Sequence, residues 1–312
     1  MTGVELIRQP GFEGESSRLL DLIGKPEPFT YETLRAARSG EPDPALSGSP
    51  DPRAEVAELY LPLRGGPTAI RLHRVASRQA QPLLLWLHGG GFVGGAAKHT
   101  DPVCSRLAVE AGVTVASLEY RLAPEDPFPA ALHDTYDALR WLIEHGTMIG
   151  GDGRVAAGGQ SAGGNLVAAA CLLARDDRLP AVSRQILCYP VLDFGSGTES
   201  ARLFDGDFLS AEADEWSDRQ YLAGQEITPY VAPLRAETLA GLPPTLVIGA
   251  GRDPLRDDAR QYAARLRADG VDVRQVEYEA TMHAFLSFSG GLSAAGHAVR
   301  LIADDLKVVF SL

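Results

Sequence analysis

The sequence contains few cysteines, no long apolar run and no cluster of basic residues, and each shortage excludes a class of protein. Its three cysteines, Cys104, Cys171 and Cys188, stand in apolar stretches without metal-ligand spacing. This pattern favours buried free thiols over disulfides or a zinc site. Free thiols are typical of a reducing compartment, so we expect a cytoplasmic protein that binds no metal.

The chain also has little that would direct it to a membrane or to nucleic acid. Its longest apolar run, Leu166 to Ala174, is far shorter than the roughly 18 residues of a membrane-spanning helix. Charged residues interrupt the apolar positions of residues 1–25, so we expect no signal peptide. No basic run offsets the net charge of -12, which argues against nucleic acid and anionic membranes as partners. A soluble globular protein is the predicted class.

Apolar segments of strand length alternate with helical segments from Pro82 onward, after a hairpin signalled by Arg64-Gly65-Gly66-Pro67. Eight strands are predicted, at Val56–Leu63, Thr68–Val75, Leu83–Leu87, Val113–Leu118, Arg154–Ala157, Ile186–Tyr189, Thr245–Ile248 and Val271–Tyr278. Helices are expected near residues 100–111, 131–145, 162–176, 256–269 and 292–309. Such alternation indicates an α/β fold, a mostly parallel eight-stranded sheet with helices on both faces.

Two regions depart from this alternation. Residues 1 to about 38 carry two short helical patterns, and residues 39–52 are rich in Pro, Gly, Ser and Asp, as linkers are. Residues 193 to about 235 are aromatic and acidic, without a clean strand. We therefore predict an N-terminal cap segment and linker at 1–53 and a main domain at 54–312 that carries a cap insertion at about 193–235.

The segment Gly158-Gly159-Gln160-Ser161-Ala162-Gly163-Gly164-Asn165 lies between a predicted strand and a predicted helix. In that context G-x-S-x-G is typical of a nucleophile elbow. The flanking glycines are needed because side chains there would collide with the adjoining strand and helix. Taken alone, the pattern also fits an ordinary glycine-rich loop. Ser161 is thus a candidate nucleophile whose assignment depends on the rest of the chain.

His88-Gly89-Gly90-Gly91-Phe92 directly follows an apolar strand. Three consecutive glycines lower the stability of the fold, because each loses much backbone entropy when the chain folds. They are expected where backbone NH groups must come close to a ligand without side chains in the way. Cleavage of an acyl compound needs such donors, because negative charge builds up on the carbonyl oxygen in the transition state. We assign the NH groups of Gly90, Gly91 and Ala162 to this oxyanion hole; a merely flexible loop is the alternative.

A serine nucleophile needs a base to take its proton. Where a serine stands on a strand-to-helix elbow, the acid and then the histidine follow it in the chain. Only His283 and His297 come after Ser161. His283 lies just beyond the last predicted strand, where a loop can carry it over the serine. His297 falls within the C-terminal helix, so we expect it to be a packing or surface residue.

The acid that orients the base should lie at the carboxyl end of the strand Thr245–Ile248. This position points to Asp253. Asp257 and Asp258 fall in the first turn of the following helix, where the helix dipole favours acidic side chains in any case. The predicted catalytic residues are therefore Ser161, Asp253 and His283.

With these residues in hand, the chain resembles the hormone-sensitive-lipase-like, bacterial family IV branch of the α/β-hydrolase carboxylesterases, over residues 54 to 310. The motifs that carry the resemblance are HGGGF (88–92), YRLAPE (120–125), FPAALHD (128–134), GQSAGG (159–164), DPLRDD (253–258) and MHAF (282–285). The resemblance implies ester hydrolysis through an acyl-enzyme, no cofactor, and a cap made by the N-terminal helices together with residues 193–235.

Two positions depart from that family's usual pattern. Gln160 stands where an Asp usually precedes the nucleophile, which removes a charge beside Ser161 and changes the local hydrogen bonding. Ala284 stands where a Gly commonly follows the histidine, which could stiffen that loop. Arg121 is expected to pair with a nearby carboxylate and to have a structural role.

Several aromatic side chains are candidates for the wall of a substrate pocket. The predicted lining residues are Phe92, Phe204, Phe208 and Phe285. Phe204 and Phe208, together with Trp216 and Tyr221, fit the interior of the cap equally well.

The predicted function is that of a serine carboxylesterase that hydrolyses small, short-chain acyl esters without a cofactor. An amidase or deacetylase of a small metabolite would use the same residues. A non-catalytic small-molecule receptor is the alternative from another class, and the presence of both Asp253 and His283 argues against it. Whether the chain forms a homodimer is left open by the sequence.

Overall fold

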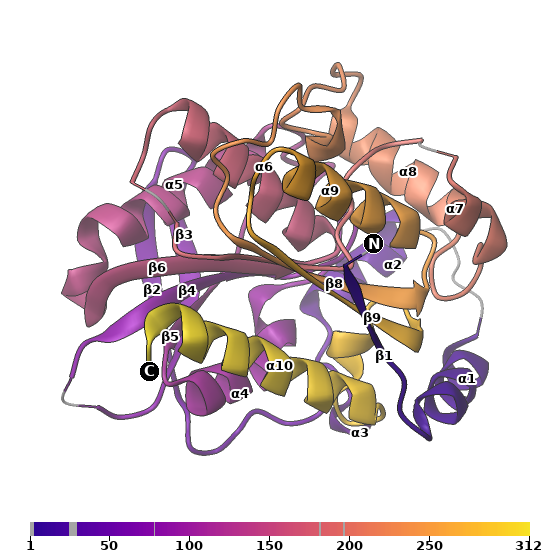
Figure 1. Cartoon of the computed structure of the whole chain (residues 1–312), viewed down its shortest axis with the longest axis horizontal. Helices are drawn as coiled ribbons and strands as arrows, with labels where there is room; N and C mark the ends of the chain where they lie inside the picture. Colours follow the sequence, from indigo (N-terminus) through magenta and orange to yellow (C-terminus); the bar gives the residue numbers. More distant parts are fainter. Residues whose placement is uncertain (1–2, 25–29, 78, 181, 196) are drawn as a thin grey trace.

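The structure is a computed structural model that describes residues 3–24, 30–77, 79–180, 182–195 and 197–312. These residues form a nine-stranded sheet in the order β1-β9-β8-β7-β6-β4-β5-β3-β2 (Figure 1). The strands are β1 Val4–Ile7, β2 Glu55–Leu63, β3 Gly66–Arg74, β4 Gln81–Leu87, β5 Thr114–Leu118, β6 Gly151–Gln160, β7 Gln185–Cys188, β8 Thr245–Arg252 and β9 Val273–Met282. Along this sheet order, every pair of adjacent strands from β1 to β5 is parallel. Strand β3 is antiparallel to β5, and β2 is antiparallel to β3.

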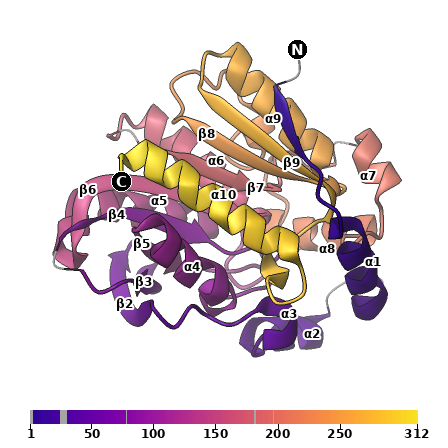
Figure 2. The same ribbon diagram turned by 60° about the horizontal axis from the view of Figure 1, so that its bottom comes forward.

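Helices cover both faces of the sheet. They are α1 Phe12–Ile23, α2 Tyr31–Ser39, α3 Pro44–Ser47, α4 Asp101–Ala111, α5 Ala130–His145, α6 Ala162–Asp176, α7 Glu199–Leu203, α8 Ala211–Leu222, α9 Arg256–Ala268 and α10 Ser293–Phe310. Helices α5, α6 and α9 pack on one face, and α4 and α10 lie side by side on the other (Figures 1 and 2). The central strand β4 is buried from Pro82 to Leu87, as expected of a parallel strand between two helical layers.

The predicted fold class is confirmed, but the sheet has nine strands rather than eight. The additional strand, β1, pairs in parallel with β9 at one edge of the sheet. Its four residues, Val-Glu-Leu-Ile, are too few to give a periodic signal by themselves, and they become a strand because β9 offers an open edge. The sequence interpretation recognised only the two helices that follow in this region, α1 and α2.

Helices α2 and α3, from the segment before residue 54, and α8, from the segment between residues 193 and 235, lie near the carboxyl ends of the strands. Helix α2 is attached there through Arg38, whose guanidinium donates to the carbonyl oxygens of Val93 and Ala123 and pairs with Glu125. Helix α8 brings Tyr221 against Phe92, with ring centroids 3.8 Å apart. None of the helices formed by the described residues is long and apolar enough to cross a membrane.

Candidate active site

Ser161 occupies a sharp turn between β6 and α6. Its φ of 54° lies in the left-handed region that favours glycine, and its NH donates to the carbonyl oxygen of Cys188 at 2.9 Å. The flanking glycines permit this turn: a Cβ on Gly159 would stand 2.5 Å from the carbonyl carbon of Gly163, and one on Gly163 would stand 2.4 Å from the carbonyl oxygen of Leu87. The turn is the strained elbow that the spacing of the glycines predicted.

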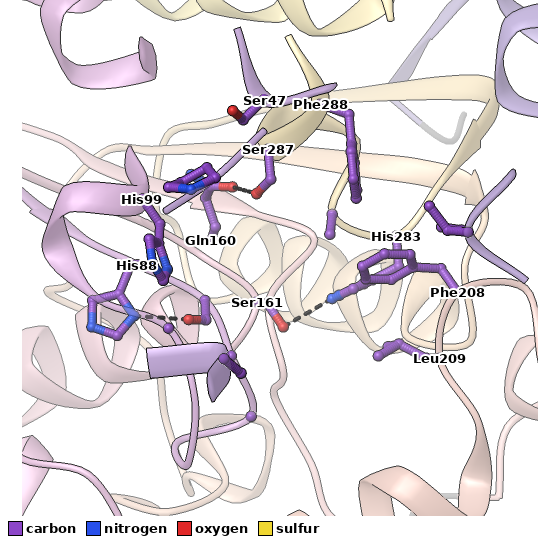
Figure 3. Close-up of a pocket in the computed structure, with 18 of the residues that line it drawn as sticks. Ser47, His88, His99, Gln160, Ser161, Phe208, Leu209, His283, Ser287 and Phe288 are labelled. Atoms are coloured by element: carbon purple, nitrogen blue, oxygen red, sulfur yellow. Dashed lines mark hydrogen bonds between the residues drawn. The ribbon is translucent and has the colours of Figure 1, made fainter. Parts of the chain in front are cut away.

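A chain of two hydrogen bonds joins Ser161 to a histidine and an aspartate. Nε2 of His283 lies 2.9 Å from the Ser161 hydroxyl oxygen (Figure 3). On the other side of the ring, Nδ1 of His283 lies 2.8 Å from Oδ2 of Asp253. The NH of Leu255 donates to Oδ1 of the same carboxylate, which fixes its orientation. Asp253 and His283 follow β8 and β9, so three parallel strands deliver the three side chains to one edge of the sheet.

The glycine loop after β4 lies against this serine. Gly89 is so close that an added Cβ would stand 3.3 Å from the Cβ of Ser161. Gly90 has a φ of 126°, and a Cβ there would stand 2.3 Å from the carbonyl oxygen of Gly94. Within the described part of the chain, the NH groups of Gly90 and Gly91 donate to no protein acceptor. They are therefore available to a ligand at this edge.

His88 holds the start of that loop. Its Nδ1 lies 2.8 Å from the Gly89 carbonyl oxygen, and its ring stacks on Tyr120 with a centroid distance of 4.2 Å. The hydroxyl of Tyr120 donates to the His88 carbonyl oxygen at 2.9 Å. Burial lowers the pKa of His88 to about 4, so its ring is neutral near pH 7. The role of this histidine is thus to position the loop.

The loop 120–125 has no side chain in the site, in agreement with the structural role expected for it. Arg121 forms a bidentate pair with the buried Asp134, its Nη2 lying 2.7 Å from Oδ1. His297, the other candidate base, lies in α10, where its Nδ1 is 2.8 Å from the Tyr278 hydroxyl. It is a packing residue, as expected. Asp257 accepts from the NH of Ser200 at 2.8 Å, at the start of α9.

Gln160 is held by two hydroxyl groups. Tyr189 and Ser287 both donate to its Oε1, at 2.7 and 3.1 Å. Its side chain does not contact His283 through a hydrogen bond, although the ring of Tyr189 lies edge-on to the imidazole at a centroid distance of 5.0 Å. Ala284, the other unusual residue, has a φ of 61°. A left-handed alanine costs roughly 1–2 kcal/mol, so the loop that carries His283 is strained at this point.

A cavity of about 660 Å³ opens above Ser161. It is within the size range of small-molecule sites. Figure 3 shows Phe208 and Leu209 on the side of His283, and His88 and His99 on the opposite side of Ser161. The N-terminal segment contributes to the wall through α2 and α3, and α8 contributes Ala213, Asp214 and Ser217, which share one helix face.

Of the four predicted pocket residues, only Phe208 lines this cavity. The prediction was wrong for the other three. Phe92 is buried in the stack with Tyr221, Phe285 packs against Tyr189 and Tyr278, and Phe204 lies under the guanidinium of Arg256. Each of these three rings packs instead against a tyrosine ring or a guanidinium group outside the cavity, contacts that aromatic rings favour.

The cavity wall also contains residues that the sequence reasoning missed, chiefly Leu209, Asp214, Ser287 and Phe288. Ser287 and Phe288 follow the MHAF motif within five residues of His283, which was a usable signal. No sequence signal pointed to Asp214, because α8 carries acidic residues on several faces and the local sequence does not show which face lines the cavity.

Two carboxyl groups of α8 are strongly affected by burial. Loss of water raises the pKa of Asp214 to about 6; His283 opposes this shift, while Asp253 and Asp205 add to it. Burial likewise raises the pKa of Asp218 to about 7, with further contributions from Asp214 and Glu215. Asp214 lines the cavity and Asp218 does not.

The three cysteines are buried free thiols, as predicted. Burial raises the pKa of Cys104 and of Cys171 to about 12 and that of Cys188 still further. In the residues that the structure describes, no three His, Cys, Asp or Glu side chains gather as metal ligands.

Comparison with known proteins gives a consistent result. The sequence profile of the α/β-hydrolase fold matches residues 84–287. The chain is 41% identical to the carboxylic ester hydrolase LipN of Mycobacterium tuberculosis over 84% of its own length and 72% of that protein's. It is 34% identical to the ethyl acetate hydrolase of Pseudomonas putida, over 88% and 90%. Among solved structures, a thermostable esterase from Pseudomonas putida ECU1011 superposes with a TM-score of 0.87 at 31% identity, covering 98% of this chain and 100% of that one.

Proposed function

Because the chain belongs to the α/β-hydrolase family, in its hormone-sensitive-lipase-like branch, and is a carboxylic ester hydrolase, we propose that Ser161, His283 and Asp253 are its catalytic triad and cleave short-chain acyl esters. The observation that carries this proposal is the unbroken chain of hydrogen bonds from Asp253 through His283 to Ser161 at the floor of the cavity.

In the first half of the reaction, the Ser161 hydroxyl oxygen attacks the ester carbonyl carbon. Its proton passes to Nε2 of His283, the atom already 2.9 Å away. Asp253 holds the proton on Nδ1, so that Nε2 is free to accept, and its charge stabilises the imidazolium that forms. The imidazolium then gives its proton to the departing alcohol oxygen, and the acyl group stays on Ser161.

The NH groups of Gly90, Gly91 and Ala162 stabilise the oxyanion of each tetrahedral intermediate. Support comes from the two glycine NH groups, which have no acceptor in the described residues, and from Ala162, which begins α6 and so has an NH without a helical partner. In the second half of the reaction, His283 takes a proton from water as the water oxygen attacks the acyl carbon. The imidazolium then returns the proton to the Ser161 oxygen as its bond to the acyl carbon breaks, which releases the acid and restores the free enzyme.

We further propose that residues 8–53 and 193–235 act together as a cap over a main domain at 54–312, to whose sheet β1 adds an edge strand. Both segments supply walls of the cavity, and these walls limit the length of the acyl chain that fits. A cytoplasmic location is proposed on the three free, buried cysteines. Whether the enzyme forms a homodimer is a question for analytical ultracentrifugation.

The test is hydrolysis of p-nitrophenyl butyrate by the wild type and by Ser161→Ala and His283→Ala. Each substitution should lower kcat by about 10⁴ or more, and the double variant should lose little beyond either single one because the triad acts as a unit. Circular dichroism of each variant provides the folding control. A Ser161→Ala enzyme with normal turnover would refute the assignment. The anilide of butyric acid, run in parallel, reports whether amides are also cleaved.

A further inference from the structure

The wall of the cavity carries an excess of acidic groups. Three carboxylates line it among the described residues, Glu41, Asp43 and Asp214, and no lysine or arginine of that part of the chain does. A cleft lined by one sign of charge concentrates ligands of the opposite sign, and a low-dielectric surrounding strengthens the effect. The cavity should therefore discriminate between substrates by charge.

The three carboxylates are not equivalent. Glu41 pairs with Lys98 at 2.6 Å, and Asp43 caps α3 by accepting from the NH of Ala45 at 2.9 Å. The backbone NH of Asp214 donates to the Ser210 carbonyl oxygen within α8, but its carboxylate has no hydrogen-bond or ion-pair partner within the described ranges. Among the three, the Asp214 carboxylate is thus the one whose oxygens are all left for a ligand.

Asp214 also lies on the side of the cavity where the chemistry takes place. Its helix neighbour on the same face, Ser217, is so close to the glycine loop that a Cβ on Gly91 would stand 3.2 Å from the serine hydroxyl oxygen. The carboxyl group feels the charges of His283 and Asp253 from the main domain and of Asp205 from the segment before α8. A cation that pairs with Asp214 would therefore sit beside the scissile ester.

We infer that Asp214 is a specificity-determining residue that makes the enzyme prefer esters carrying an ammonium group over uncharged or anionic esters of the same shape. The inference rests on the proposed function, since it concerns the substrate of the same site. An ammonium group in the acyl or the alcohol part would replace the water that Asp214 loses, while a carboxylate in that position would meet a like charge.

Two pairs of isosteric substrates test this inference. On the acyl side, the pair is p-nitrophenyl 4-(trimethylammonio)butanoate and p-nitrophenyl 5,5-dimethylhexanoate. On the alcohol side, it is acetylcholine and 3,3-dimethylbutyl acetate. The quaternary ammonium group keeps its charge at every pH, and each rate is divided by the rate of hydroxide-catalysed hydrolysis to remove intrinsic reactivity. The p-nitrophenyl monoester of glutaric acid serves as the anionic member.

At pH 8 we expect kcat/KM to favour the cation over its uncharged isostere by about tenfold or more in at least one pair, since close charge pairs shift binding by that order. The glutarate monoester should be the poorest acyl substrate. In Asp214→Asn the ratio should fall to near one, while Asp214→Glu, which keeps the charge, should retain it. Asp218→Asn is the matched control: it removes a carboxylate one turn away that does not line the cavity, so it should keep the preference.

A pH series gives a second readout. The ratio within a pair cancels any pH dependence of the catalytic steps, which both substrates share. It should therefore rise with pH through about 6 as Asp214 ionises, modulated by the nearby Asp205, Asp218, Asp253 and His283. A ratio that is flat with pH, equal for both members of both pairs, or unchanged in Asp214→Asn would overturn the inference. Failure to hydrolyse even the uncharged esters would instead count against the proposed function.

Discussion

The hydroxyl of Tyr189 donates to Oε1 of Gln160 at 2.7 Å, which fixes the side chain of the residue before the nucleophile. Ser287 donates to the same oxygen, so Gln160 serves two hydroxyl groups as an acceptor, which a carboxylate could also do. The neutral amide preserves the hydrogen bonding but adds no charge beside the triad.

Gln160→Asp should move the acid limb of the kcat/KM profile to modestly higher pH. A carboxylate at position 160 would favour the protonated imidazole, which is inactive as a base. The measurement is kcat/KM for p-nitrophenyl butyrate between pH 5 and 9. Gln160→Asn, neutral and shorter, should leave the limb where it is. An unmoved limb in Gln160→Asp would mean that position 160 lies outside electrostatic range of His283.

Gly90→Ala should lower kcat by about 10²–10³ with little change in KM, because it displaces an oxyanion donor that acts mainly in the transition state. The new Cβ would stand 2.3 Å from the Gly94 carbonyl oxygen, at a φ of 126°. Gly112→Ala is the matched control: its φ of 69° is also positive, but nothing lies within 4 Å of its Cβ and it is remote from the site. It should cost stability and keep kcat. Equal kcat losses in both variants would point to a folding defect instead.

The acyl-chain preference should rise from acetate to butyrate or hexanoate and then collapse towards palmitate. Each buried CH₂ contributes about 0.8 kcal/mol until the chain meets the far wall. That wall is close, because the N-terminal segment and the 193–235 segment both cover the cavity. The measurement is kcat/KM for p-nitrophenyl esters from C2 to C16, below and above the solubility limit. Rates that climb to palmitate, or a jump when droplets form, would contradict the short-chain assignment and leave the triad intact.

Asp218→Asn should stabilise the protein at pH 8 by about 1–3 kcal/mol and progressively less towards pH 4. The pKa of Asp218 is raised in the folded state to about 7, against roughly 3.9 in the unfolded chain. Below the unfolded pKa the carboxyl group is neutral in both states, and the wild type loses no stability through it. As the pH rises through 7, ionisation favours the unfolded chain, so the free energy of unfolding of the wild type falls. The amide stays neutral throughout and avoids this loss.

The free energy of unfolding in urea, measured at pH 4, 5 and 8, checks this prediction. Glu212→Gln provides the control, because Glu212 is an exposed carboxylate on the same helix. It should show no gain that grows with pH. A pH-independent effect of Asp218→Asn would show that the carboxyl group ionises in the folded protein as it does in the unfolded chain.

The sequence by itself determined the features that depend on local backbone geometry. Glycines on both sides of Ser161 are needed because backbone atoms of Leu87 and Gly163 lie within 2.5 Å of where their Cβ atoms would be. The requirement for these glycines therefore appears in the sequence as the G-x-S-x-G spacing around Ser161. Helix α6 spans residues 162–176, as its apolar pattern predicted. Chain order then left His283 as the base by elimination, and the fold brings its Nε2 to 2.9 Å from the Ser161 hydroxyl oxygen.

Tertiary structure alone decided which side chains face the cavity and which short segment completes the sheet. Phe92 and Phe208 are both aromatic residues near the site, yet one is stacked on Tyr221 and the other lines the wall. Strand β1 exists because the edge of β9 is open to it. Asp214 has a raised pKa because segments from distant parts of the chain exclude water from it. These properties arise from packing between elements, whereas local sequence constrains only the backbone of each element.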